Sequence, residues 1–315
     1  MRSPRLRLLL AALAAAPGVV AQAAPARAAR QGTPTTSTAT ASTTAATTTL
    51  PQTPLPVPLP PPDRTQPPWS QAPVGLLAIG AVEVGEAAGG AFWRLGTPRG
   101  AVLAWRPGGY RPSEAGLVVY LHGYYTTVDQ AAQEHRLFEQ FRDSGRNALF
   151  IVPEAPAWNG EESVWPELPR LLDEVARRTG LALPAGPLVV SAHSGGFRTV
   201  LLWLGEPRLE EIHLLDGLYR SEDRFRAWVE TMGRSGPRRL VLLGDETQSS
   251  VALLASTVAG AVVLQEVPPL RTGLTGAART ARLLAIRSQH PHMAIVESGE
   301  VVPVLLGASR LPAVR

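Results

Sequence analysis

Short apolar runs alternate with amphipathic segments along most of the chain after Trp69. The run 117–121 is apolar throughout, which is typical of a strand buried on both faces. Leu171, Leu172 and Val175 are spaced as on the inner face of a helix. The pattern predicts strands at 76–84, 91–95, 101–105, 117–121, 148–152, 187–191, 211–215, 239–243 and 261–267. The run 261–267 is expected to be the last strand of the chain. It predicts helices at 128–144, 168–179, 195–204, 222–232 and 249–258.

Strands and helices that alternate in this way are joined by right-handed crossovers. The expected fold is therefore α/β, with a doubly wound, mostly parallel sheet and helices on both faces.

The first residues do not follow this pattern. A basic start at 1–7, an apolar run at 8–20 and the small-residue site Ala21-Gln22-Ala23 together predict a Sec-type signal peptide over 1–23. The apolar run is shorter than the roughly twenty residues that a membrane span needs. We therefore expect no stable membrane span after cleavage, and a protein that is secreted, periplasmic or held in the cell envelope.

Residues 24–70 are rich in Thr, Ala and Pro, a composition that buries too little apolar surface to form a core. They are predicted to be a disordered linker, which leaves 71–315 as a single catalytic domain. A tether across the envelope and a passive spacer are both compatible with this composition.

Composition and charge exclude several functions. The chain has no cysteine, which excludes disulfides, thiolate metal sites and a cysteine nucleophile. Its net charge of +4 falls to +1 when the three arginines of the signal segment are removed, so no nucleic-acid partner is expected. Covalent catalysis, if present, has to use an oxygen nucleophile.

Ser194 lies between a predicted strand and a predicted helix, in the sequence Ser191-Ala192-His193-Ser194-Gly195-Gly196. A small residue two positions before the serine and a glycine two positions after it form the nucleophile-elbow pattern, with Ala192 in place of the usual glycine. Small residues are needed because the turn is tight. A glycine-rich turn with a helix-capping serine is the ordinary alternative, and the strongly apolar strand before it favours the nucleophile.

A second motif follows the strand 117–121, which runs directly into His122-Gly123-Tyr124-Tyr125. With this motif and the elbow, residues 74–310 resemble the α/β-hydrolase superfamily. The resemblance implies the α/β-hydrolase fold, a structural His122, and an oxyanion hole formed by the backbone N–H groups of Tyr124 and Gly195. It also implies that no cofactor is required.

The same resemblance implies a catalytic acid and then a histidine base after the last strand. His292 opens an apolar segment and is preferred to His290 as the base. Asp216 directly follows an apolar run, where a buried acid needs a partner, whereas Asp245 is typical of an exposed helix cap. Asp216 is the preferred acid, and Asp245 and His290 remain alternatives.

Three aromatic residues, Tyr125, Trp158 and Trp165, are candidates for substrate contacts. The predicted function is a secreted serine hydrolase, most simply a carboxylic-ester hydrolase, acting on a small-molecule or envelope-derived acyl substrate through an acyl-enzyme at Ser194. The alternatives are a peptidase or amidase acting on envelope or extracellular substrates, and a non-catalytic binding protein that keeps the fold. His290 and His292 lack further ligands nearby in the sequence, so no metal is expected.

Overall fold

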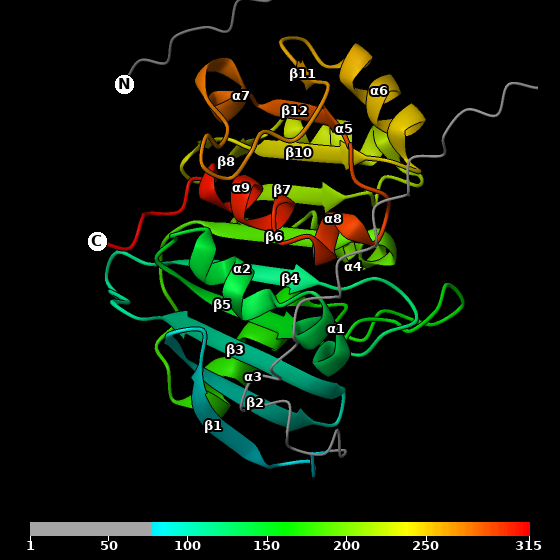
Figure 1. The fold of residues 1–315 in the computed structure, drawn as a ribbon. Coiled ribbons are helices and arrows are strands. Elements are labelled where there is room, and N and C mark those ends of the chain that lie inside the picture. The colour runs from blue at the N-terminus through cyan, green and yellow to red at the C-terminus, as the bar shows by residue number, and fades with distance from the viewer. Residues whose placement is uncertain (1–76) are drawn as a thin grey trace, which may run out of the picture. The chain divides into compact units, whose positions relative to one another are not determined.

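The computed structural model describes residues 77–315 (Figure 1). The predicted signal peptide at 1–23, the linker at 24–70 and the beginning of the predicted strand at 76–84 lie outside the described residues. Within residues 77–315, no helix is both long enough and apolar enough to cross a membrane.

One sheet of ten strands forms the centre of the described part, in the order β1-β2-β3-β5-β4-β6-β7-β10-β12-β11. Its strands are β1 (Val82–Ala87), β2 (Gly90–Thr97), β3 (Gly100–Pro107), β4 (Gly116–Leu121), β5 (Ala148–Pro153), β6 (Leu188–His193), β7 (Leu209–Leu215), β10 (Arg239–Gly244), β11 (Val262–Leu264) and β12 (Leu283–Arg287). The β1–β2, β2–β3 and β3–β5 pairs are antiparallel, and the other pairs are parallel. The predicted mostly parallel sheet is confirmed.

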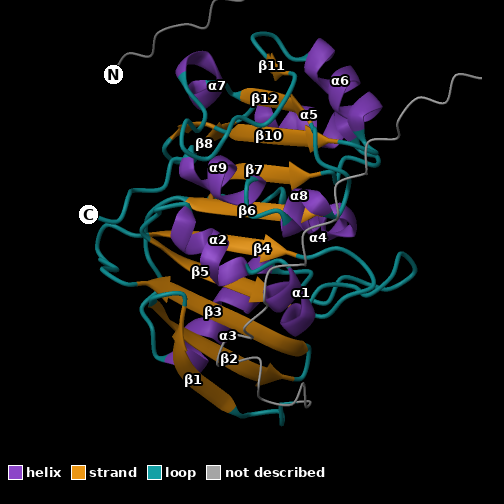
Figure 2. Ribbon diagram, in the orientation of Figure 1, coloured by secondary structure: helices purple, strands orange, loops and turns teal. Residues whose placement is uncertain are grey.

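Helices cover both faces of the sheet (Figure 2). One face is covered by α3 (Leu168–Thr179), α4 (Phe197–Trp203), α5 (Glu222–Val229) and α6 (Gln248–Thr257). The other is covered by α1 (Val128–Glu134), α2 (Leu137–Asp143), α7 (Gly276–Thr280), α8 (Ala294–Glu297) and α9 (Val301–Gly307). In β4, Val119 faces the first core and Val118 the second, which explains why this strand is apolar throughout.

Four predicted elements differ from the structure. Of the strand predicted at 76–84, residues 77–81 are loop and turn, and β1 begins only at Val82 and continues to Ala87. The strand predicted at 261–267 is only β11, at the edge of the sheet, and the last strand of the chain is β12, which the sequence analysis missed. The helix predicted at 128–144 is two helices, because Arg136 adopts a left-handed conformation with φ 48°. The helix predicted at 222–232 ends at Val229, before a small hairpin of β8 (Met232–Gly233) and β9 (Gly236–Pro237).

Candidate active site

The carboxyl ends of four adjacent parallel strands, β4, β6, β7 and β10, meet at one edge of the sheet (Figure 1). In open α/β sheets, ligands bind at this edge. The residues that directly follow β4, β6 and β7 are His122, Ser194 and Asp216, and Asp245 follows β10. The topology therefore brings the candidate residues of the sequence motifs to the same edge.

Ser194 occupies a sharp turn between β6 and α4. Its φ is 49°, a left-handed conformation that is uncommon for a residue with a side chain. The surroundings of the turn are crowded: a Cβ on Gly195 would lie 2.3 Å from Cζ of Tyr124, and one on Gly196 would lie 3.0 Å from the carbonyl oxygen of His122. A side chain at Gly195 would have to displace the Tyr124 ring, and one at Gly196 would press on the backbone of His122, so the turn favours small residues after the serine.

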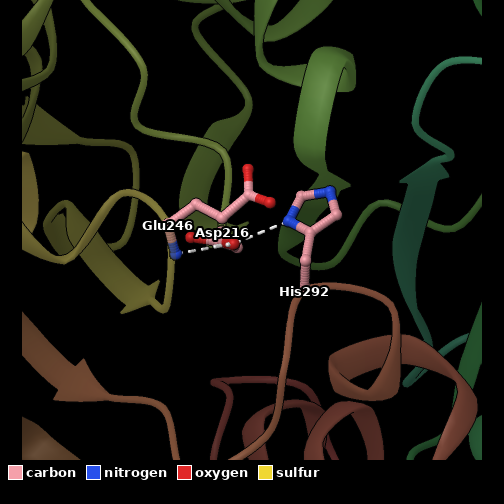
Figure 3. A group of neighbouring side chains, drawn as sticks. All are labelled: Asp216, Glu246 and His292. Carbon is pink, nitrogen blue, oxygen red and sulfur yellow. Dashed lines mark hydrogen bonds and ion pairs between the residues drawn. The ribbon is translucent and has the colours of Figure 1, made fainter.

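Asp216 is fully buried at the end of β7 and accepts five hydrogen bonds. Oδ1 accepts from the backbone N–H groups of Asp245 (2.9 Å) and Thr247 (2.9 Å) and from the Thr247 hydroxyl (2.7 Å). Oδ2 accepts from the backbone N–H of Glu246 (3.2 Å) and from Nδ1 of His292 (2.6 Å) (Figure 3). Burial alone raises the pKa of Asp216, but these donors outweigh it and lower the pKa below its usual value. The carboxyl group is therefore ionised at neutral pH.

His292 lies on the loop between β12 and α8 and is partly exposed. The hydrogen bond to Asp216 raises the pKa of His292, which burial lowers to a smaller extent. Because the Asp216 carboxylate is ionised, Nδ1 of His292 carries the proton that is donated to it. Nε2 points away from Asp216 (Figure 3) and is left as an acceptor in the neutral ring.

The side chains of the two alternative residues, Asp245 and His290, take no part in the Asp216–His292 pair. The side chain of Asp245 is exposed, and its backbone N–H is a donor to Asp216. Nε2 of His290 lies 3.5 Å from Glu300. Of the sequence-predicted candidates, the structure pairs His292 with Asp216.

Two contacts link the turn of Ser194 to the Asp216–His292 pair. The rings of His193, the residue before Ser194, and His292 have centroids 4.6 Å apart and are tilted by 36°. A Cβ on Gly217, the residue after Asp216, would be 3.1 Å from the carbonyl oxygen of Ser194. No Ser194–His292 hydrogen bond is present among residues 77–315, and hydrogen bonds of this kind often tighten only when substrate binds.

The loop after β4 lies against Ser194. A Cβ on Gly123 would be 3.0 Å from Cβ of Ser194, so the backbone of this loop passes directly over the serine. His122 holds the loop in place: its Nδ1–H donates to the carbonyl oxygen of Gly123 (2.8 Å), and its Nε2 lies 3.1 Å from both the backbone nitrogen of Ala155 and Oε1 of Glu154. The backbone N–H groups of Tyr124 and Gly195 belong to the two segments that meet here.

The predicted aromatic contacts separate into two groups. Tyr125 and Trp158 are 88% and 56% exposed, and the backbone N–H of Tyr125 donates to Ala157 (2.8 Å), which joins their loops. Trp165 is only 4% exposed and packs in the core beside Trp203. Its burial counts against the predicted substrate contact, because the side chain does not reach the surface.

Several neighbours of the site carry no recognisable signal in the sequence. The Tyr219 hydroxyl donates to the exposed side chain of Glu246 (3.0 Å). On the other side of Ser194, Nη1 of Arg198 donates to the Tyr124 hydroxyl (3.3 Å) and to the carbonyl oxygen of Asn159 (2.6 Å). These contacts depend on how the loops fold, which residue spacing does not reveal.

Asp216, Glu246 and His292 also have ligand atoms within 4.8 Å of one another, close enough to hold a metal ion (Figure 3). Both oxygens of Asp216 already accept hydrogen bonds, and three of the five donors are backbone N–H groups. A metal ion on these oxygens would displace several of these hydrogen bonds. The donor set therefore fits an ionised, hydrogen-bonded carboxylate better than a metal ligand.

No family model matches the sequence, and the search of curated proteins gave no relative. The chain is similar to several solved structures. An S-formylglutathione hydrolase from Agrobacterium tumefaciens is 12% identical, over 73% of this chain and 99% of that one, with a TM-score of 0.45. The feruloyl esterase module from Clostridium thermocellum is 9% identical, over 71% and 86%, with a TM-score of 0.44. Brefeldin A esterase, titled a bacterial homologue of human hormone sensitive lipase, is 14% identical, over 69% and 70%, with a TM-score of 0.38.

Proposed function

We propose that this chain is a secreted serine hydrolase that cleaves a carboxylic ester through an acyl-enzyme at Ser194. The observation that carries the proposal is the 2.6 Å hydrogen bond between Asp216 and His292, next to a serine in a strained strand-to-helix turn. A buried acid, a histidine and an activated serine in this relation form the triad that drives acyl transfer on many folds.

Each residue has a defined task in the proposed reaction. Nε2 of neutral His292 takes the proton of Ser194 Oγ as the oxygen attacks the ester carbonyl. Asp216 keeps the proton of His292 on Nδ1 and stabilises the imidazolium that forms. The backbone N–H groups of Tyr124 and Gly195 stabilise the oxyanion, which in comparable sites is worth about 3 kcal/mol for each donor.

The second half of the reaction uses the same groups. The imidazolium of His292 donates its Nε2 proton to the leaving alcohol, and the acyl group stays on Ser194. Water, deprotonated by His292, then attacks the acyl-enzyme and releases the acid. No cofactor enters either step. The predicted signal peptide supports a substrate outside the cytoplasm, either a small-molecule ester or an acyl group of the cell envelope.

The test is to treat the purified protein with a fluorophosphonate probe and to assay it on short-chain p-nitrophenyl esters. Ser194→Ala is expected to abolish labelling and to lower turnover by at least about 10³-fold, because the nucleophile is lost. Ser191→Ala is the matched control, since Ser191 is a buried serine of β6 three positions earlier. It should label and turn over as the wild type does.

Other outcomes would select the alternative functions. Labelling together with faster cleavage of an anilide than of the matching ester would identify an amidase or peptidase. A folded wild type that neither labels nor turns over would sink the catalytic proposal in favour of a binding protein that keeps the fold.

A further inference from the structure

His193 is a buried histidine for which the proposed mechanism has no role. It is the last residue of β6 and is 2% exposed. Its Nε2 lies 3.2 Å from the backbone carbonyl oxygen of His292. Its ring lies against the ring of His292, with centroids 4.6 Å apart and an angle of 36° between the planes, and meets the ring of His135 edge-on at 6.1 Å. His193 thus touches both the backbone and the side chain of the candidate base.

The direction of the hydrogen bond fixes the tautomer of His193. A carbonyl oxygen can only accept, so Nε2 of His193 carries the proton and donates it to His292. Nδ1 is then unprotonated and faces the loop after β4, where it lies 3.1 Å from the position of a Cβ on Gly123. His193 therefore lies between the loop of the proposed base and the loop of the proposed oxyanion hole.

The surroundings keep His193 uncharged. Burial lowers its pKa to about 3, and the positive charges of protonated His292 and His135 add to this effect, against a smaller opposing effect of Asp216 and of the bond to His292. Burial likewise lowers the pKa of His135 to about 4. The ring of His193, which contacts that of His292, thus stays neutral when His292 becomes protonated, and does not repel the imidazolium.

We propose that His193 is a positioning residue, which holds the backbone at His292 so that its ring stays between Asp216 and Ser194. The inference rests on the proposed function. Residues 288–293 form no helix or strand. The carbonyl oxygens of Pro291 and Met293, on either side of His292, accept backbone N–H groups of α8 (3.1 Å each), and the carbonyl oxygen of His292 itself accepts from His193. A displacement of about 1 Å at a catalytic group lowers the rate by up to about 10²-fold.

The experiment compares two variants of the full chain, His193→Gln and His193→Met. The amide N–H of glutamine is as many bonds from Cβ as Nε2 of histidine and can donate to the same carbonyl. Methionine fills similar space without a donor. We expect His193→Met to lower kcat about 10- to 100-fold with KM changed less than about 2-fold, and His193→Gln to recover most of the loss.

The pH profile distinguishes positioning from simple packing. Loss of the donor loosens the bond between His292 and Asp216, and this bond is what raises the pKa of His292. The pH at which kcat/KM falls on acidification (the acid limb) should therefore be lower in His193→Met than in the wild type, and close to the wild-type value in His193→Gln. A packing role would lower the melting temperature of both variants and leave the acid limb in place.

A measurement independent of turnover keeps the proposal testable if a variant does not fold. Nitrogen NMR of the histidines in folded Ser194→Ala should show His193 neutral, with its proton on Nε2, at pH 6. A proton on Nδ1, a charged ring, or wild-type kcat and acid limb in His193→Met would each overturn the proposal. If the wild type itself shows no turnover that depends on Ser194, the proposed function fails instead, and the NMR result still reports on the contact.

Discussion

Two fully buried carboxylates lie at opposite ends of β7, Glu211 within the strand and Asp216 directly after it, and each binds a histidine. Glu211 and Asp216 have no exposed surface. Oε1 of Glu211 lies 2.8 Å from Nε2 of His213, and Oδ2 of Asp216 lies 2.6 Å from Nδ1 of His292. The two pairs are therefore alike in their chemistry and in their strand.

The two pairs differ in their other partners and in their exposure to solvent. Glu211 also pairs with the buried guanidinium of Arg239 and accepts the backbone N–H of Arg310 (3.1 Å), and the side chain of His213 is fully buried. Around Asp216 the other donors are uncharged, and the side chain of His292 is 21% exposed beside Ser194. A buried carboxylate–histidine pair is thus not by itself a functional signal; access to solvent and a neighbouring nucleophile distinguish the candidate site.

The largest expected effect tests Asp216, the proposed catalytic acid at the carboxyl end of β7. Asp216→Asn should lower kcat/KM by about 10⁴-fold, as when a triad aspartate is changed to asparagine elsewhere, because the amide no longer holds the proton on Nδ1 of His292. Asp245→Asn is the matched control, since only the backbone of Asp245 contacts Asp216. It should retain turnover within about 3-fold. A loss that follows Asp245 instead of Asp216 would transfer the role of the acid to Asp245.

The next largest effect tests the fully buried pair of Glu211 and His213. Glu211→Gln should destabilise the fold by about 3–5 kcal/mol, because it leaves the guanidinium of Arg239 buried without a counter-ion. Denaturant unfolding followed by fluorescence measures the change. Turnover per folded molecule should stay within about 2-fold of the wild type. A variant as stable as the wild type but inactive would show that the two ends of β7 are not separate in function.

Much of this architecture could be predicted from the sequence, because it depends on local pattern. Continuous apolar runs predict strands buried on both faces, and the small residues around Ser194 predict the tight turn. The strand β12 was missed because its apolar run is short and the loop after it lacks a helical pattern. The break at Arg136 was missed because the left-handed backbone occurs at an arginine and not at a glycine or asparagine, so the sequence carries no helix-ending residue there.

The choice between the two aspartates shows the limit of local pattern. Asp216 is ionised because backbone N–H groups 29 to 31 residues later converge on it. No spacing rule reveals this convergence, which requires β7 and β10 to be neighbours in the sheet. The contacts of Tyr219 and His193 are of the same kind, since each joins segments that meet only in the folded chain.

The smallest expected effect is a difference in pH dependence: turnover, which depends on the Asp216–His292 pair, should be lost at a higher pH than the stabilisation that the carboxylates of β7 give to the fold. Only neutral His292 can accept the proton of Ser194, and Asp216 raises the pKa of His292. As the pH is lowered, kcat/KM should therefore fall, with an inflection above the ordinary histidine value of about 6.5. Below this inflection the loss is about tenfold for each pH unit.

The two carboxylates should keep their stabilising effect through this first loss of activity, whereas His135 and His193, buried as neutral rings with pKa values of about 4 and about 3, favour the unfolded chain as the pH falls below about 6.5. Burial raises the pKa values of Glu211 and Asp216, but their hydrogen bonds and ion pairs lower them further, so both values lie below those of the unfolded chain. Their stabilisation is therefore complete above the unfolded value of about 4 and is lost only as the pH falls through the lower folded values. Circular dichroism and turnover, measured on the same samples from pH 8 to pH 3, should show that turnover falls at a higher pH than the fold is lost, and that turnover returns at pH 8. Simultaneous loss of turnover and fold near pH 4 would mean that the titration of His292 does not control the reaction.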